Sequence, residues 1–340
     1  MKRTEHQKQT TTQPGTLVLT RPEIAASLNL EDCIAAVEQA FKLHAQGQTL
    51  PPGVLGVPAR DGGFHIKAAG LKLERTYFAV KTNGNFFHNR ERYGMPNIQG
   101  IIVLCDGDNG YPLAVMDSIE ITIQRTGAAT AVAAKYLARP NSRVATICGC
   151  GNQGRIQLSA LTKVRRLEQF YAFDTDETQA QRFADELSAK LGIAITAVAD
   201  LAKAVPESDI CVTCTPSRRY FLKKDWVAPG TFIAAVGADS EDKQELDPKL
   251  FVANKIVVDI LEQCATIGDL HHALKAKLVT RADVHAELGE IVAGRKPGRA
   301  ADDEITIFDS TGTALQDAAA AAIVYENAVR SGRGLKLNFY

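Results

Sequence analysis

The fold is decided by one stretch, Arg143-Val-Ala-Thr-Ile-Cys-Gly-Cys-Gly-Asn-Gln-Gly154. It begins as a short apolar run, breaks at three glycines, and continues as a helical pattern from Arg155. Gly149, Gly151 and Gly154 have the spacing G-x-G-x-x-G, which suits a turn whose backbone N–H groups approach a pyrophosphate at the positive end of a helix. The stretch therefore predicts the strand, tight turn and helix of a dinucleotide-binding unit.

A second predicted strand supports this interpretation, because a lone glycine pattern is weak evidence. The run Gln169-Phe-Tyr-Ala-Phe173 is followed by Asp174, which lies 20 residues past Gly154. A carboxylate at that place can accept both hydroxyl groups of an adenosine ribose, and it would repel a 2′-phosphate. The pattern therefore favours NAD over NADP as the cofactor. A glycine turn in some other α/β domain stays open as the alternative.

Length and charge argue against several classes of protein. With 340 residues the chain can bury a sizeable core, and the usual domain size predicts two domains. Lysine plus arginine and aspartate plus glutamate both number 39, so the net charge is zero and no nucleic-acid partner is expected. Residues 1–15 are polar, which predicts a disordered tail and not a signal peptide. Because no apolar run approaches the length of a membrane span, no membrane partner is expected, and the predicted location is the cytoplasm.

The cysteines and histidines are not spaced as metal ligands. Seven cysteines in 340 residues do not form a disulfide framework. Cys211 and Cys214 make a C-x-x-C pattern in an apolar predicted strand, where an offset of three sends the two side chains to opposite faces. The seven histidines are scattered without H-E-x-x-H or similar spacing. No metal site is therefore predicted.

The first part of the chain predicts a helix and a small antiparallel sheet. Apolar residues recur at helical spacing over residues 30–45. An Ala-rich helix is predicted over residues 119–137, before Pro140. Between the two helices, turn signals separate three β-like runs, residues 64–68, 77–82 and 98–104.

The second part predicts a parallel sheet with helices on both faces. Strand-like runs alternate with segments of helical length, which is typical of a doubly wound α/β domain; they are residues 193–198, 210–215, 232–236 and 255–258. Ligands of such sheets bind outside the carboxyl ends of the strands. Asp239 follows one of these ends and a turn at Gly237, so it is a candidate acid/base facing a nicotinamide. A side chain that caps the next turn is an equally open interpretation.

Three cations fall in apolar surroundings, where a charge needs a partner. Lys67 and Lys81 lie inside predicted strands. Either lysine can hold a substrate carboxylate, and the alternative is an ammonium group that reaches the edge of the sheet. Arg125 lies among small apolar residues, where an anion must offset its charge. We expect a ligand phosphate or carboxylate there in preference to a structural carboxylate.

Several longer motifs resemble those of the ornithine cyclodeaminase/mu-crystallin family, and among its branches they are most similar to the archaeal-type alanine dehydrogenases. The motifs stand in the family's order at residues 81–85, 110–117, 125–129, 237–247 and 304–312. The resemblance implies a Rossmann domain and a smaller α+β domain whose mainly antiparallel sheet forms a homodimer. It implies that residues 16–128 with 313–340 bind the substrate and dimerise, and that residues 129–312 bind NAD.

The resemblance also implies roles for particular residues. Asp239 would be the catalytic acid/base and Lys81 the catalytic lysine of the substrate site. Lys67 and Thr311 would contact the substrate with Lys81, and Arg125 would lie against the dinucleotide phosphates. The other cofactor contacts would come from Gly149, Gly151, Gln153, Gly154, Asp174, Thr215, Val236, Lys243 and Ser310, and from Asn97, where relatives have threonine.

One position departs from the family pattern. Many relatives have an arginine after a proline-rich run, where it binds the substrate carboxylate, but this chain has Gly53. Lys67, Lys81 or another cation would then bind the carboxylate, or the substrate is not the usual small amino acid.

The implied chemistry is hydride transfer at an amino-bearing carbon. NAD takes hydride from Cα of a small L-amino acid, and water attack on the imine then releases ammonia and a 2-oxo acid. This dehydrogenase, or an imine reductase in reverse, is the preferred prediction. The alternative is a cyclodeaminase, in which the substrate's own amine attacks the imine and hydride returns from the cofactor. The third possibility is an NAD(P)-binding protein without turnover, as in mu-crystallin.

Overall fold

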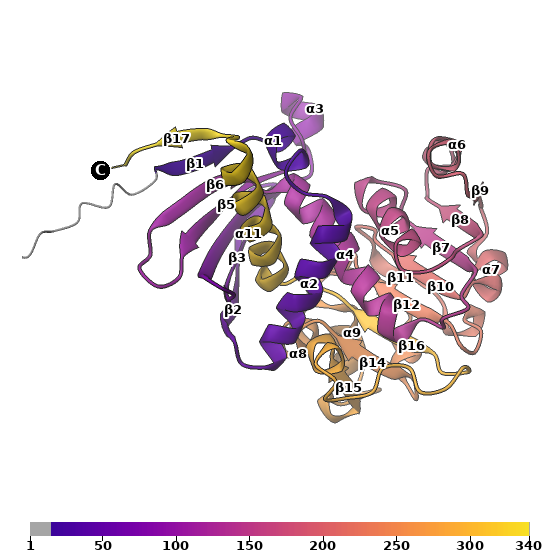
Figure 1. Cartoon of the computed structure of the whole chain (residues 1–340). Helices are drawn as coiled ribbons and strands as arrows, with labels where there is room; N and C mark the ends of the chain where they lie inside the picture. The colour runs from indigo at the N-terminus through magenta and orange to yellow at the C-terminus, as the bar shows by residue number, and fades with distance from the viewer. Residues whose placement is uncertain (1–14, 340) are drawn as a thin grey trace, which may run out of the picture.

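The structure is a computed structural model that describes residues 15–339. The chain forms two large sheets with helices packed between them and around the second (Figure 1). Apart from Gly15, the predicted disordered tail lies outside the described residues. Among the helices of residues 15–339, none is long and apolar enough to cross a membrane.

The first sheet has seven strands in the order β17-β1-β6-β5-β4-β3-β2. Strands β2 to β6 pair antiparallel in sequence order, and β1 adds to β6 in parallel. The C-terminal β17 pairs antiparallel with β1. The bounds are Thr16–Leu19 (β1), Thr49–Ala59 (β2), Gly62–Lys72 (β3), Thr76–Phe86 (β4), Ile98–Asp106 (β5), Pro112–Asp117 (β6) and Leu335–Leu337 (β17).

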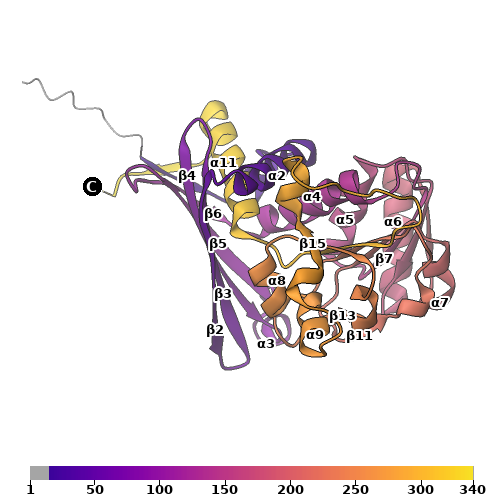
Figure 2. The same ribbon diagram turned by 90° about the horizontal axis from the view of Figure 1, so that it is seen from below.

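Helices cover one face of this sheet and separate it from the second sheet (Figure 2). The side chain of Asn29 accepts the N–H of Asp32 and so caps the start of α2, whose apolar stripe is buried. Thr313 caps α11 in the same way, and Gly332 ends it with a φ of +66°. The helices on this face are Arg21–Ala25 (α1), Leu30–Ala45 (α2), Ile119–Leu137 (α4) and Ala314–Ser331 (α11). The short helix Asn89–Tyr93 (α3) lies in the connection between β4 and β5.

The second sheet has eight strands, all parallel, in the order β15-β14-β16-β12-β10-β7-β8-β9. Its strands are Val144–Cys148 (β7), Gln169–Phe173 (β8), Ala194–Ala197 (β9), Ile210–Thr213 (β10), Phe232–Ala235 (β12), Lys255–Val258 (β14), Val284–Glu287 (β15) and Thr306–Asp309 (β16). A two-stranded sheet pairs Arg218–Leu222 (β11) with Gln244–Leu246 (β13).

Helices connect the strands of the second sheet and lie on both of its faces (Figure 1). The α-helices are Asn152–Thr162 (α5), Glu177–Leu191 (α6), Leu201–Ala204 (α7), Leu261–Ile267 (α8), Asp269–Lys275 (α9) and Leu288–Val292 (α10). The 3-10 helices are Val205–Glu207, Lys224–Trp226, Pro248–Phe251 and Arg281–Asp283.

The predicted fold class is confirmed, with a doubly wound parallel sheet beside a smaller, mainly antiparallel one. The helices predicted at residues 30–45 and 119–137 have the same bounds as α2 and α4. Strand β2 is missing from the sequence prediction because Pro51 and Pro52 argue against a strand. It lies at the edge of the sheet, which is where proline is tolerated.

The division into domains stays a prediction. The strands of the first sheet come from residues 16–117 and 335–337, and those of the second come from residues 144–309. Helix α4 runs through the predicted boundary between residues 128 and 129 and packs against α2 on one side and α5 on the other. One continuous helix thus fixes the two sheets relative to each other.

Candidate active site

The glycine turn joins β7 to the first residues of α5. Gly149 has a φ of +104°, which residues other than glycine rarely adopt. A Cβ on Gly154 would collide with the carbonyl oxygen of Gly149, so a glycine is required for the helix to approach the turn. Around Gly151, by contrast, no atom lies within 4 Å of the place that a Cβ would take. The turn therefore leaves room for a ligand at the start of α5, as a pyrophosphate requires.

Asp174 lies at the end of β8, beside the glycine turn. Its Oδ2 accepts the N–H of Cys150 at 2.8 Å, and its Oδ1 accepts the N–H of Asp176 at 3.1 Å. At the start of α5, the side-chain oxygen of Gln153 is buried and has no hydrogen-bond partner in the described part of the chain. An acid after the second strand and an unpaired oxygen at the helix start fit a bound dinucleotide.

Replacing Asp174 by alanine is expected to weaken NADH binding about tenfold, a loss of roughly 1.4 kcal/mol, and to reduce the preference for NADH over NADPH. The carboxylate that would bind the ribose hydroxyls, and repel a 2′-phosphate, is then absent. Fluorescence titration with both cofactors measures the effect, with Asp185→Ala on the exposed side of α6 as control. An unchanged ratio of the two affinities would move the ribose site elsewhere.

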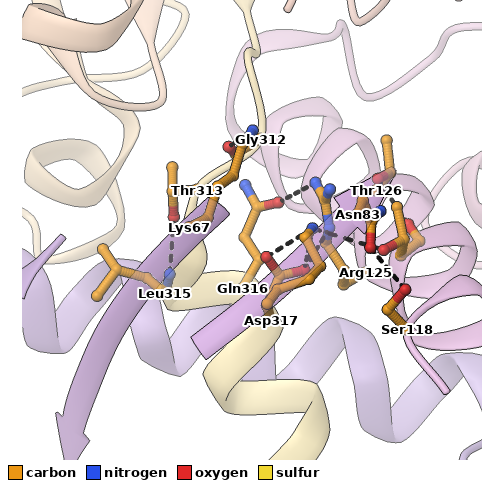
Figure 3. Close-up of polar contacts among 12 residues, drawn as sticks. Lys67, Asn83, Ser118, Arg125, Thr126, Gly312, Thr313, Leu315, Gln316 and Asp317 are labelled. Carbon is orange, nitrogen blue, oxygen red and sulfur yellow. Dashed lines mark hydrogen bonds and ion pairs between the residues drawn. The ribbon is translucent and has the colours of Figure 1, made fainter. Parts of the chain in front are cut away.

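One carboxylate, Asp317 in the first turn of α11, contacts Arg125 (Figure 3). The same carboxylate binds Lys81. Lys81 Nζ lies 2.9 and 2.7 Å from the two carboxylate oxygens of Asp317. Arg125 Nε donates to the same carboxylate at 3.0 Å, and its Nη1 donates to Oε1 of Gln316 at 2.8 Å. The preference for a ligand anion as the partner of Arg125 is therefore wrong: a structural carboxylate offsets its charge. Its predicted contact with the dinucleotide phosphates stays a prediction.

Lys67 joins the same cluster from the neighbouring strand. It stands opposite Lys81 in the antiparallel register of β3 and β4. Its Nζ donates to the carbonyl oxygens of Thr311 and Gly312, at 3.0 and 2.6 Å. Only 6% of Lys67 and 3% of Lys81 is exposed. Neither ammonium group therefore reaches the sheet edge, which removes that alternative for both lysines.

This cluster of Lys67, Lys81, Arg125 and Asp317, called the cation cluster below, carries a surplus of positive charge. Among the described residues, Asp317 is the only carboxylate that forms an ion pair with any of the three cations. Burial lowers the pKa of Lys81 to about 7, assisted by Arg125 and Lys67 and opposed by Asp317. Burial and Arg125 also lower the pKa of Lys67. An added anion would therefore be stabilised beside these cations.

Asp239 lies in the loop after β12, at a cavity of about 950 Å³ between the β2–β3 hairpin and the loops of the second sheet. Lys243 donates to its Oδ1 at 2.6 Å, and 36% of the Asp239 side chain is exposed. Burial raises the pKa of Asp239, but Lys243 and Lys67 outweigh it and bring the pKa below its ordinary value. Asp239 is therefore ionised at neutral pH, which suits a proton acceptor.

The other predicted residues fall into three groups. Thr215 and Val236 follow β10 and β12, on the same edge of the sheet as Asp239. Ser310 and Thr311 follow β16 and are buried, and both hydroxyl groups donate to Asp259. Asn97 is exposed, and its side-chain oxygen accepts the N–H of Arg90 in the loop around α3. Its predicted contact with the cofactor stays a prediction.

Sequence reasoning missed two residues of the site. Asp317 is a lone acid in the Ala-rich run 314–322, and a carboxylate on such a buried helix requires a cation, which is a signal that the sequence does contain. His65 lines the cavity, where burial lowers its pKa. It precedes Lys67 by two residues and so shares its face of the strand, but no pattern distinguishes it from a packing residue.

Together these features define a class: an α/β protein with a Rossmann-type nucleotide site, and a buried cationic cluster beside an ionised aspartate. The chain belongs to the ornithine cyclodeaminase/mu-crystallin family, whose model matches residues 15–332. The resemblance noted from the motifs is thereby confirmed.

Individual relatives are similar in sequence and structure over almost the full length of the chain. Alanine dehydrogenase of Archaeoglobus fulgidus is 40% identical over 325 residues, which cover 96% of this chain and 99% of the relative. An archaeal alanine dehydrogenase dimer with bound NAD has a TM-score of 0.91 at 40% identity and the same coverage. Thermococcus litoralis Δ1-pyrroline-2-carboxylate reductase, solved with NADH and L-proline, has a TM-score of 0.90 at 36% identity, covering 95% of this chain and 100% of the neighbour.

Proposed function

We propose that the protein is an NAD-dependent oxidoreductase that transfers hydride at the Cα–N bond of a small L-amino acid, with imine reduction or reductive amination as the reverse reaction. The observation that carries the proposal is the arrangement of charge. An amino acid has a carboxylate and an amine on one carbon, and the site has a cation cluster near an ionised Asp239. Lys67 lies within electrostatic range of both parts of the site, because its charge interacts with Arg125 in the cation cluster and with Asp239.

NAD is the cofactor, and the chain's own residues have room for it. The open space at Gly151 suits its pyrophosphate, and the carboxylate of Asp174 suits the hydroxyl groups of its ribose. When bound, NAD supplies the acceptor for the hydride.

The remaining steps fall to the side chains of the site. Lys67 and Lys81 bind the substrate carboxylate and hold Cα in place. Asp239 accepts the amine proton on Oδ2, because its Oδ1 is bonded to Lys243. Loss of the Cα hydride then leaves an imine, and water attack on its carbon expels ammonia and gives the 2-oxo acid.

The absence of an arginine at Gly53 raises the question of which residues bind the substrate carboxylate. Strand β2 pairs Val54 with Lys67 and Gly53 with Ala68. Because neighbours on a strand face opposite sides, a side chain at position 53 would project from the face opposite Lys67. We propose that Lys67 and Lys81, backed by Arg125, supply the positive charge for the substrate carboxylate.

Binding of that carboxylate is expected to take up a proton above neutral pH. The pKa of Lys81 is about 7 in the free protein, so the lysine is mostly neutral at about pH 8.5, and a bound anion raises its pKa and restores the proton. Titration calorimetry of pyruvate into the NADH complex, in buffers of different ionisation enthalpy, should give an uptake of about one proton at pH 8.5 and nearly none at about pH 5.5. Equal uptake at both pH values would remove Lys81 from the carboxylate site.

A cyclodeaminase remains the alternative reaction, because the family includes it by name and because a lysine and an aspartate at the site serve both reactions. Binding without turnover is the third, and the ionised Asp239 argues against it, since a pure binder needs no proton acceptor there. Deuterium at Cα distinguishes the three. A dehydrogenase transfers the label into accumulating NADH, a cyclodeaminase returns it to the cyclic product, and a binder leaves it on the substrate.

We also propose that the uncovered face of the first sheet joins a second copy of the chain. Residues along β4 alternate between buried and half-exposed, so helices cover only one face. The other face carries Leu55, Phe64 and Ile101, which are 57%, 41% and 49% exposed. An apolar sheet face of this kind needs a cover, and the archaeal alanine dehydrogenase relative is a dimer.

Replacing Ile101 by lysine is expected to convert a dimer into a monomer, because the charge would be buried in the apolar interface without a partner. Light scattering coupled to size exclusion measures the mass of both proteins. Tyr220→Lys is the matched control, since Tyr220 is 48% exposed on β11 of the two-stranded sheet. A wild-type monomer, or a variant that stays dimeric, would contradict the assignment of this face.

A further inference from the structure

Glu245 is a buried carboxylate that joins two loops of the cofactor edge. It lies in β13 and is fully inaccessible to solvent. Its Oε1 accepts the backbone N–H of Thr215 at 2.6 Å and the hydroxyl of Thr215 at 2.7 Å. Its Oε2 accepts the N–H of Gly237 at 2.8 Å. One side chain therefore binds the second residue beyond the end of β10 and the second residue beyond the end of β12.

The fit between Glu245 and these loops is tight. A Cβ on Gly237 would lie about 2.5 Å from the Glu245 carboxylate and would also collide with the carbonyl oxygen of Thr215. Only glycine lets the loop after β12 come this close to the carboxylate. Asp239, the proposed proton acceptor, follows Gly237 by two residues. The position of the Gly237 backbone therefore determines where the Asp239 side chain lies.

The backbone of Glu245 is itself fixed by a second buried acid. Oδ1 of Asp269 accepts the N–H groups of Glu245 and Leu246, both at 2.9 Å. Asp309, at the end of β16, in turn accepts the N–H groups of Asp269 and Leu270 at 3.2 and 2.9 Å. Each acid thus holds the backbone at the next acid, from the centre of the sheet to the loop of Asp239.

These acids have no cationic partners in residues 15–339, which sets them apart from ordinary buried ion pairs. Burial raises the pKa of Glu245, and burial together with Glu245 raises the pKa of Asp269 to about 7. Such groups are costly for stability, so their retention needs a reason other than stability.

A parallel arrangement serves the substrate side. Asp259 accepts the N–H of Gly312 at 2.7 Å and the hydroxyl of Thr311 at 3.1 Å. The carbonyl oxygens of these two residues bind Lys67. Buried acids at the ends of β14 and β16 therefore support both halves of the site.

We propose that Glu245 is a positioning residue for hydride transfer: by bonding Thr215 and Gly237 it fixes the loops that carry Asp239 and border the nicotinamide. The proposal deepens the proposed function and rests on it. Glu245 itself touches neither substrate nor cofactor and acts through these two loops.

The test is Glu245→Gln, which keeps the shape of the side chain. A glutamine oxygen can still accept from Thr215, but its NH₂ group would face the N–H of Gly237, so two donors would oppose each other. Asp209→Asn is the matched control, because Asp209 accepts the N–H groups of Arg143 and Val144 at the opposite, amino ends of the strands. Both variants are expected to lose stability.

Two readouts separate positioning from stability. The fluorescence lifetime of bound NADH should shorten in Glu245→Gln and stay at the wild-type value in Asp209→Asn, because only the former frees the nicotinamide. With an amino-acid substrate, kcat should fall about tenfold or more in Glu245→Gln while KM changes less than about threefold. Wild-type lifetime and kcat in folded Glu245→Gln would overturn the proposal.

The lifetime measurement needs no substrate, so it tests the role of Glu245 even if no amino acid is turned over. A lack of turnover in the wild type would refute only the proposed function. If Glu245→Gln does not fold, Glu245→Asp replaces it, because it keeps the carboxylate but shortens the side chain by one CH₂ group, so that the side chain no longer reaches both Thr215 and Gly237. It should also shorten the lifetime, and an unchanged lifetime in that variant would equally overturn the proposal.

Discussion

Replacing Asp239 by asparagine is expected to lower kcat about 10²- to 10⁴-fold while the affinity for NADH stays within about twofold of wild type. An asparagine cannot accept the amine proton, because its amide is not basic, so formation of the imine is slowed. The cofactor contacts proposed at the glycine turn and at Asp174 are on other loops and stay intact. Initial rates with a saturating amino acid, and fluorescence titration with NADH, measure the two quantities.

A matched control for this variant is Asp225→Asn, which removes an exposed acid from the same domain. It should leave both rate and affinity unchanged. If turnover in Asp239→Asn is undiminished, Asp239 has no part in proton transfer. Asp239 would then be interpreted as a side chain that caps the following turn. A variant that loses NADH binding as well would show that Asp239 shapes the cofactor site and does not act on the substrate alone.

Replacing Asp317 by alanine is expected to lower the free energy of unfolding by about 3–5 kcal/mol, the usual cost of leaving a buried charge without its partner. Lys81 and Arg125, whose side chains are 3% and 6% exposed, would both lose the one carboxylate that pairs with them among residues 15–339. The denaturation midpoint in urea, monitored by fluorescence and circular dichroism, measures the loss.

Glu168→Ala is the control for that loss, because Glu168 forms an exposed ion pair with Arg143. The side chain of Glu168 is 64% exposed and that of Arg143 is 46% exposed. Its effect should be below about 1 kcal/mol. Equal effects of the two substitutions would mean that the cation cluster is stabilised by something other than Asp317.

Much of the fold was predictable because its signals are local. The stripe of apolar residues over residues 30–45 and the proline after residue 139 are enough to bound α2 and α4. The glycine turn is equally local, because its three glycines lie within six residues in a recognisable spacing, and Gly154 is required by the carbonyl oxygen of Gly149 in the same turn. Strand β2 could not be predicted in this way, since two prolines disguise an edge strand that only its pairing with β3 defines.

The site was less predictable because its contacts join distant parts of the chain. Lys81 and Arg125 could be identified as buried cations that need an anion. Their partner Asp317 lies 236 and 192 residues further along the sequence, and nothing local pairs it with them. Glu245 illustrates the same limit, since its neighbours in the loop resemble a family motif but its contact with Thr215 depends on how β10 and β13 are placed.

The proposed reaction oxidises an amino acid at Cα with net reduction of NAD. It can be tested with a panel of L-amino acids that includes alanine and ornithine, with NADH absorbance and free ammonia recorded in the same wells. We expect that a small amino acid gives NADH and ammonia in equal amounts, and that a 2-oxo acid with ammonia consumes NADH. Ammonia released without net NADH, from a trace of NAD, would instead establish a cyclodeaminase and refute the proposed oxidation.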